Sequence, residues 1–161
     1  MERILVPLDG SPLAEEALSH AKRLAAGFSG TIFLVRVVPT AQQLAAASFA
    51  SASGMQGVPP IDIDSMDKVV ALQIDEARAY LTEVARKMQS EGVHAEWEVR
   101  EGAAPDVIIE TAREKRIDAI VISSHGRSGF GRLVFGSVAD RVIRDSGIPV
   151  MVIKPAKGRG A

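Results

Sequence analysis

Five short apolar runs, rich in β-branched residues, alternate along this chain with segments of helical periodicity. Such runs predict buried strands. Helical segments between strands predict crossover connections, because parallel strands cannot be joined by tight turns. The chain is therefore expected to form a doubly wound α/β fold, with a five-stranded, mostly parallel sheet and helices on both faces. The five predicted strands are residues 3–8, 31–38, 94–100, 118–124 and 149–153.

The connecting segments predict four helices. Ser11 fits the N-cap of the first helix, and Pro12 suits its first turn. Residues 94–100 alternate apolar and polar side chains, which is typical of an edge strand with one polar face. We find no internal repeat, so residues 1–155 are expected to form a single domain, followed by a disordered tail at 156–161. The other predicted helices are residues 66–90, 105–115 and 137–145.

Residues 40–60 contain no charged side chain and are rich in Ala, Ser, Gly, Gln and Pro. This composition predicts a flexible, uncharged insertion, which we assign to residues 40–64. Two interpretations remain open. The segment is either a lid over a ligand or a dimer contact, or it is a surface insertion that the fold tolerates.

Charge and composition exclude several classes of function. The 161 residues include 19 basic and 20 acidic side chains, so no excess of positive charge favours nucleic-acid binding. The chain has no cysteine, which excludes thiol catalysis and disulfides and agrees with a cytoplasmic location. We see no signal peptide, and no uncharged apolar run approaches the ~18 residues that a membrane-spanning helix needs.

The loop between the fourth predicted strand and the last helix is the richest candidate site. It holds Gly126, Gly129, Gly131 and Gly136, and it ends where a helix begins. Glycines let a backbone approach a ligand closely, and a helix N-terminus offers unpaired N–H groups with partial positive charge. The pattern predicts a phosphate site. Ser137 and Asp140 also fit a capping box, which would explain that pair of residues without a ligand.

Common catalytic motifs are absent from the sequence. The glycines do not continue into the Lys-Ser/Thr of a P-loop, and they do not match the dinucleotide fingerprint. The three histidines have no metal-ligand spacing, and no pair of carboxylates suggests acid–base catalysis. We therefore expect no catalytic residues and no protein metal site.

Four stretches of the sequence resemble the universal stress protein family: RILVPLDGS, LVRVV, EGAAPDVIIETA and SSHGRSGFGRLVFGSVADRVIRDSGIPVMVIKP. The resemblance extends over residues 1–155. Members of the family that bind ATP carry the motif G-x2-G-x9-G-[S/T]. Here Gly126, Gly136 and Ser137 match this motif, while Ser123 replaces its first glycine. The resemblance implies a Rossmann-like sheet with strand order 3-2-1-4-5.

The resemblance also implies a binding site for ATP or AMP. Asp9 would accept hydrogen bonds from the ribose hydroxyls. Pro7, Leu8 and Val37 would lie at the adenine. Mg²⁺ could bridge the phosphates. The residues implied near the ribose and phosphates are Ser123, His125, Gly126, Arg127, Gly136, Ser137 and Val138.

A homodimer is the last implication of the resemblance. The final strands would pair between subunits through Pro149, Val150, Met151, Val152 and Ile153. Pairing would cover an apolar strand that would otherwise be an exposed edge. The function implied is a regulatory nucleotide-binding protein of the stress response. A nucleotide-free dimeric scaffold and a slow ATPase remain as alternatives.

Overall fold

The structure is a computed structural model, and it describes residues 2–52, 63–124 and 136–154. Its strands are β1 (Arg3–Pro7), β2 (Thr31–Val38), β3 (Ala95–Glu101), β4 (Ala119–Ser123) and β5 (Val150–Ile153). Its helices are α1 (Pro12–Phe28), α2 (Ala41–Ala52), α3 (Ile63–Ser90), α4 (Ala104–Glu114) and α5 (Ser137–Asp145). The predicted tail at 156–161 lies outside the described residues.

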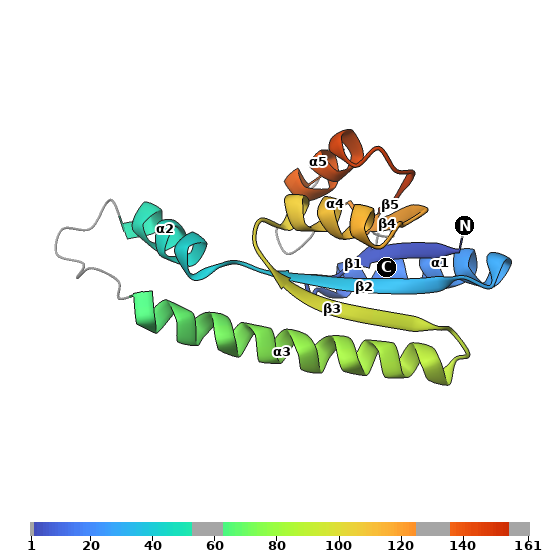
Figure 1. Cartoon of the computed structure of the whole chain (residues 1–161), viewed down its shortest axis with the longest axis horizontal. Coiled ribbons are helices and arrows are strands. Elements are labelled where there is room, and N and C mark those ends of the chain that lie inside the picture. The colour runs from blue at the N-terminus through green and yellow to red at the C-terminus, as the bar shows by residue number, and fades with distance from the viewer. Residues whose placement is uncertain (1, 53–62, 125–135, 155–161) are drawn as a thin grey trace, which may run out of the picture.

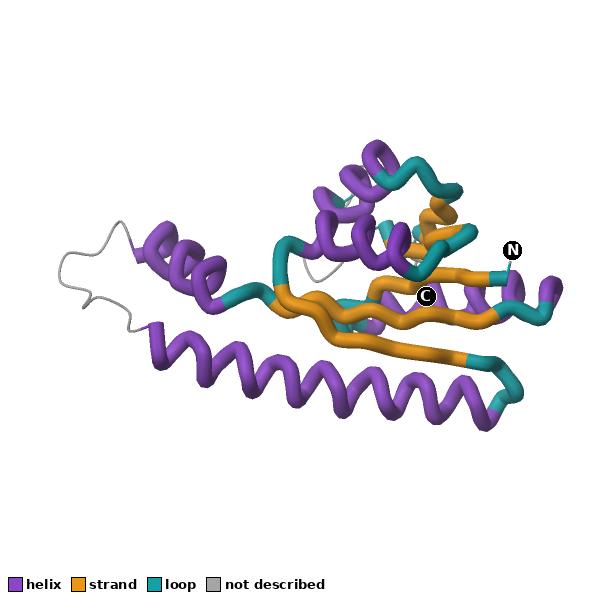
Figure 2. The backbone as a smooth tube through the Cα atoms, in the orientation of Figure 1, coloured by secondary structure: helices purple, strands orange, loops and turns teal. Residues whose placement is uncertain are grey.

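The strands form one sheet in the order β3-β2-β1-β4-β5, and every neighbouring pair is parallel. Figure 2 shows the strands side by side with helices on both faces. The predicted fold class and strand order are therefore confirmed. Because the order reverses between β1 and β4, the carboxyl ends of these two strands form the crevice in which ligands of such sheets usually bind.

Alternate residues of the buried strands belong to two hydrophobic cores, one on each face of the sheet. Ile4 and Val6 of β1 pack on the face that α1 and α3 cover, whereas Leu5 packs on the face of α4 and α5 (Figure 1). All three side chains are fully buried. The two-residue period of a strand places its odd and even positions on opposite faces of the sheet. Both faces therefore need apolar residues, which explains the continuous apolar runs.

The structure differs from the sequence prediction at residues 41–52, which form helix α2 instead of a loop. Alanine, the commonest residue of this helix, has the highest helix propensity, and this preference outweighs the lack of charge. Ala41 and Leu44 at the start of α2 pack against Val70 and Ala77 of α3. In Figure 1, α2 and the start of α3 extend away from the sheet. Residues 53–62 lie outside the described residues.

Candidate functional site

A cavity of about 280 Å³ opens at the carboxyl ends of β1, β2 and β4. Its walls come from these strands, from the turn after β1 and from the first residues of α4 and α5. Its volume lies near the lower end of the range for ligand pockets, about 300–1,000 Å³. The lining residues are Pro7, Leu8, Asp9, Ala14, Val35, Val37, Ala104, Ile108, Ile122, Ser123, Ser124, Gly136, Ser137, Val138 and Ala139.

The turn after β1 has a fixed shape at the edge of this cavity. The backbone N–H of Leu8 donates to the carbonyl of Val35 at 2.9 Å, which extends the pairing of β1 with β2. The N–H of Ser11 then donates to Oδ1 of Asp9 at 2.9 Å. This bond closes a turn in which the Asp9 side chain is oriented by its own backbone. An oriented carboxylate, which only accepts hydrogen bonds, suits the binding of hydroxyl groups.

The same turn begins helix α1. The Ser11 hydroxyl accepts a hydrogen bond from the N–H of Ala14 at 3.1 Å, so Ser11 is the predicted N-cap and Pro12 lies in the first turn. This part of the sequence interpretation is confirmed. The side chains of Asp9 and Ser11 therefore both accept hydrogen bonds from the backbone between β1 and α1.

The exit of β4 and the start of α5 meet directly. The N–H of Gly136 donates to the carbonyl of Ser124 at 2.7 Å, and the N–H of Ser124 donates to that of Ile153 at 2.7 Å. These bonds bring Ser123 and Ser137 to the same cavity although 13 residues separate them. The glycine-rich segment between them, residues 125–135, lies outside the described residues.

The expected capping box at Ser137 is wrong. Gly136 is the N-cap of α5, and Ser137 is the first helical residue, one position too late to cap. Asp140 instead forms an ion pair with Arg144 at 3.2 Å. The ligand-independent explanation for Ser137 and Asp140 is thereby removed. Glycine at an N-cap supplies no side-chain acceptor, and no side chain of the described residues caps the first N–H groups of α5, which begins at the cavity.

Two helices present their N-termini to the cavity. Helix α4 begins after Ala103 and α5 after Gly136, and neither N-cap has a side-chain hydrogen bond within the described ranges. Ala104 and Ser137, the first residues of these helices, both line the cavity. A helix N-terminus carries roughly half a positive charge and favours a bound anion. The end of the cavity at α5 is therefore electrostatically suited to phosphate.

Part of the cavity wall is apolar. Val35 and Val37 of β2 and Ile122 of β4 line it, together with Ile108 of α4. Such a surface suits a flat, weakly polar ring. Sequence reasoning named Val37 but missed the others. The signal was available, because Val35 is two residues from Val37 and strand periodicity places both on one face.

Eight of the eleven predicted binding residues line this cavity: Pro7, Leu8, Asp9, Val37, Ser123, Gly136, Ser137 and Val138. The other three, His125, Gly126 and Arg127, lie outside the described residues. The juxtaposition comes from the parallel topology, since every strand ends at the same edge of the sheet. The contacts of all eleven residues with a ligand stay predictions.

Comparison with known proteins places the chain among close structural relatives. The model of the universal stress protein family matches residues 1–154. The universal stress protein MJ0531 of Methanocaldococcus jannaschii is 31% identical over 156 residues, which cover 97% of this chain and 84% of that protein. The solved structure of the protein MJ0577 has a TM-score of 0.77 at 22% identity and covers 96% of both chains.

Two of the solved relatives are complexes with a nucleotide, one with cyclic AMP and one with dAMP. The universal stress protein from Archaeoglobus fulgidus, in complex with dAMP, has a TM-score of 0.62 at 24% identity, with 96% of this chain and 98% of that chain covered. At this identity the likeness establishes a shared fold. Separately, no helix among the described residues is long and apolar enough to cross a membrane.

Proposed function

The chain belongs to the universal stress protein family, and on that premise we propose that it is a regulatory protein of the stress response that binds ATP or AMP. The observation that carries the proposal is the cavity at the strand exits. It combines an oriented carboxylate, an apolar wall and an uncapped helix N-terminus, which match the ribose, base and phosphates of a nucleotide. The dAMP bound by a relative of the same fold supports this class of ligand.

The adenosine half of the ligand would lie over the carboxyl ends of β1 and β2. Adenine would lie against Val37, Pro7 and Leu8, which line the apolar part of the cavity. The carboxylate of Asp9 would accept hydrogen bonds from the ribose hydroxyls. The Ser11 N–H, which donates to Oδ1 at 2.9 Å, orients this carboxylate at the edge of the cavity.

The phosphates would lie at the start of α5. Gly136, Ser137 and Val138 would bind them through backbone N–H groups and the Ser137 hydroxyl, with Ser123 nearer the ribose. His125, Gly126 and Arg127 are proposed contacts from the loop outside the described residues. Among the described residues no group of three His, Asp or Glu could hold a metal ion, so Mg²⁺ would bind mainly through the phosphates.

The proposal further includes a homodimer in the cytoplasm. An apolar edge strand, Val150–Ile153, favours pairing with a second copy, and a chain without cysteine agrees with a reducing compartment. Regulation would act through a surface that changes when nucleotide binds.

Isothermal titration with ATP, AMP and cyclic AMP tests the proposal, together with identification of any nucleotide released when the purified protein is denatured. Asp9→Asn keeps an oxygen for the Ser11 N–H but replaces the second acceptor with a donor. It should raise the Kd for ATP roughly tenfold to a hundredfold, the effect of losing a hydrogen bond to a charged group, about 1.5–3 kcal/mol. Gly136→Val should weaken binding by placing a side chain at the phosphates.

Asp75→Asn is the matched control, because Asp75 is an exposed carboxylate on α3 that pairs only loosely with Arg78, at 3.7 Å. Its Kd should equal that of the wild type. No binding at millimolar ATP would contradict the proposal and favour a nucleotide-free dimeric scaffold, the alternative that Ser123 in the motif supports. Steady phosphate release from bound ATP would favour the slow ATPase.

A further inference from the structure

A cluster of polar side chains lies behind the turn after β1, on the opposite face of the sheet from the apolar wall of the cavity. Arg36 of β2 places its guanidinium carbon 5.3 Å from the ring centroid of Tyr80 on α3. The Tyr80 hydroxyl donates to Oε1 of Glu15 on α1 at 2.9 Å. Figure 1 shows α1 and α3 on this same face of the sheet. The cluster therefore joins β2, α3 and α1 at one point.

Gly10 rests directly on this cluster. A Cβ atom built on Gly10 would lie 3.1 Å from Nη1 of Arg36 and 3.3 Å from its guanidinium carbon. Gly10 also has a φ of +82°, a conformation that glycine adopts at little cost. The absence of a side chain thus lets the backbone between Asp9 and Ser11 lie against the planar guanidinium, whose other neighbour is the Tyr80 ring.

Arg36 is close to both the Tyr80 ring and the turn at Gly10, and within the described part of the chain it forms no ion pair within 4 Å. Burial, the hydrogen bond to Glu15 and the Glu15 charge raise the pKa of Tyr80 well above its ordinary value, although the Arg36 charge acts in the opposite direction. Tyr80 therefore stays protonated and remains a donor to Glu15.

We propose that Arg36 and Tyr80 are positioning residues that hold the turn of Asp9, Gly10 and Ser11 so that the Asp9 carboxylate faces the ribose of a bound nucleotide. This inference rests on the proposed nucleotide-binding function. Neither side chain lines the cavity, so both act through the turn. The guanidinium plane supports the backbone of Gly10, and Tyr80, held by Glu15, keeps that plane in place.

The test compares the Kd values of ATP and 2′,3′-dideoxy-ATP by isothermal titration. The Kd of 2′,3′-dideoxy-ATP divided by that of ATP measures what the ribose hydroxyls contribute to binding. A variant that merely destabilises the fold would weaken the binding of both nucleotides equally and leave this ratio unchanged. In the wild type the ratio should exceed tenfold, and Asp9→Asn should bring it close to one. Arg36→Met should lower the ratio at least threefold, and the milder Tyr80→Phe about twofold. Arg78→Met, an exposed arginine on the same helix as Tyr80, should preserve it.

A second readout needs no nucleotide. The Ser11 amide, which donates to Asp9 Oδ1, should exchange its hydrogen at least threefold faster in Arg36→Met and remain unchanged in Arg78→Met. If Arg36→Met does not fold, Tyr80→Phe carries both measurements. A wild type that binds no nucleotide overturns the proposed function. If the wild type binds ATP but the Arg36 and Tyr80 variants keep its ratio of Kd values, only this inference is overturned. That conclusion holds even if the Ser11 amide exchanges faster in the variants.

Discussion

At the scale of single residues, Gly102 shows how strongly one backbone position constrains the neighbourhood of the site. Its φ is +138°, and a Cβ there would lie 2.8 Å from Cγ2 of Val107 in the first turn of α4. Its N–H donates to the carbonyl of Val38 at 2.9 Å, which ties the exits of β2 and β3 together. Gly102→Ala should therefore combine backbone strain with a clash and destabilise the protein by about 2–4 kcal/mol in urea unfolding.

Substitutions at two other glycines distinguish the effect of backbone strain from that of the steric clash. Gly92 has a φ of +78° but open space around its Cβ position, so Gly92→Ala should cost only the strain, about 1 kcal/mol. Gly27 lies inside α1 with open space and no positive φ, so Gly27→Ala should stabilise by about 0.5–1 kcal/mol. If Gly102→Ala cost no more than Gly92→Ala, Val107 would have to move aside easily, contrary to the packing described.

The sequence predicted the roles of single residues where neighbouring residues determine them. It did not predict roles that depend on contacts between distant segments. Ser11 could be assigned as an N-cap because Pro12 and the following helix fix its position. The N-cap of α5 could not be assigned in this way, because Gly136 is an acceptable N-cap, although a weaker one than Ser137 in isolation. The contact between Arg36 and Tyr80 could not be predicted, since 43 residues separate them and only the packing of α3 on β2 brings them together.

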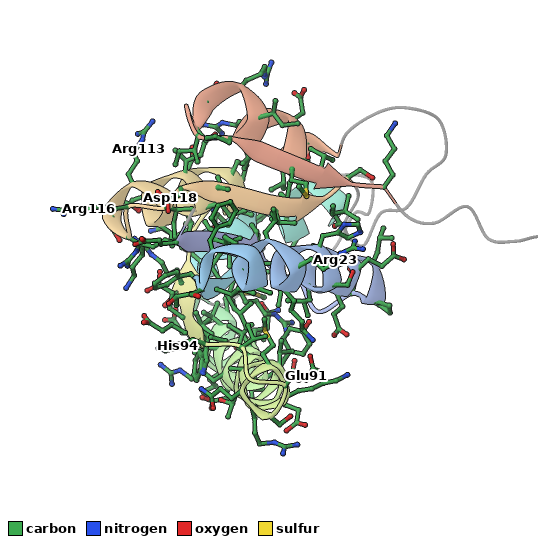
Figure 3. The ribbon with its side chains drawn as sticks, turned by 90° about the vertical axis from the view of Figure 1, so that its right-hand side faces the viewer. Arg23, Glu91, His94, Arg113, Arg116 and Asp118 are labelled. Carbon is green, nitrogen blue, oxygen red and sulfur yellow. The ribbon has the colours of Figure 1, made fainter. Side chains whose placement is uncertain are left out.

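At the scale of elements, the start of β1 is anchored by one side chain. Oδ2 of Asp118, just before β4, accepts hydrogen bonds from the N–H groups of Glu2 at 2.7 Å and Arg3 at 3.0 Å. Figure 3 looks onto this end of the molecule, with Asp118 close to the sheet. These two bonds favour the ionised form and hold the pKa of Asp118 below its ordinary value.

This lowered pKa predicts a pH-dependent contribution to stability. A carboxyl group whose pKa is lower in the folded than in the unfolded protein stabilises the fold above its unfolded pKa, about 3.9, and loses that contribution as the pH falls through the folded value. Asp118→Asn should therefore lower the urea midpoint at pH 7, and the difference from wild type should shrink below pH 4. Asp75→Asn should change the midpoint little at either pH, and an Asp118 effect that persists unchanged at pH 3 would contradict the argument.

The elements themselves were predictable to different degrees. Strand β2 was predicted with its observed bounds because its apolar run ends at a proline, which cannot continue the ladder. Helix α2 was missed because its sequence lacks the apolar residues at every third or fourth position that mark a surface helix. Alanine propensity and packing on α3 stabilise it instead, and only the first of these can be read locally.

At the scale of the whole molecule, topology explains most of what the sequence could foretell about the site. Residues 7–9, 37 and 123 are far apart in the chain, yet each ends or directly follows a strand of one parallel sheet, whereas residues 136–138 begin α5. Knowing the strands was enough to expect the first group at one edge, and the family resemblance added the second. The contribution of α4 through Ala104 and Ile108 depends on how that helix crosses the sheet, which no local pattern encodes.

The outer edge of β5 carries the last prediction. The carbonyls of Pro149 and Ile153 accept from the N–H groups of Ile120 and Ser124, at 2.9 and 2.7 Å. By strand alternation, the backbone groups of Val150 and Val152 point away from β4, and no strand pairs with them within the described residues. The outward N–H and C=O groups of Val150 and Val152 form a template for pairing with a second copy.

Val152→Pro should therefore break the dimer without removing a bond between β4 and β5, because the lost N–H points outward. We expect a dimer for the wild type in sedimentation velocity at about ten micromolar, and at least a tenfold weaker dimer for Val152→Pro. Leu72→Lys is the control, since Leu72 on α3 is 65% exposed and belongs to a different surface. Dissociation by Leu72→Lys but not by Val152→Pro would place the interface on α3, because a charge disrupts only the apolar surface that the partner covers.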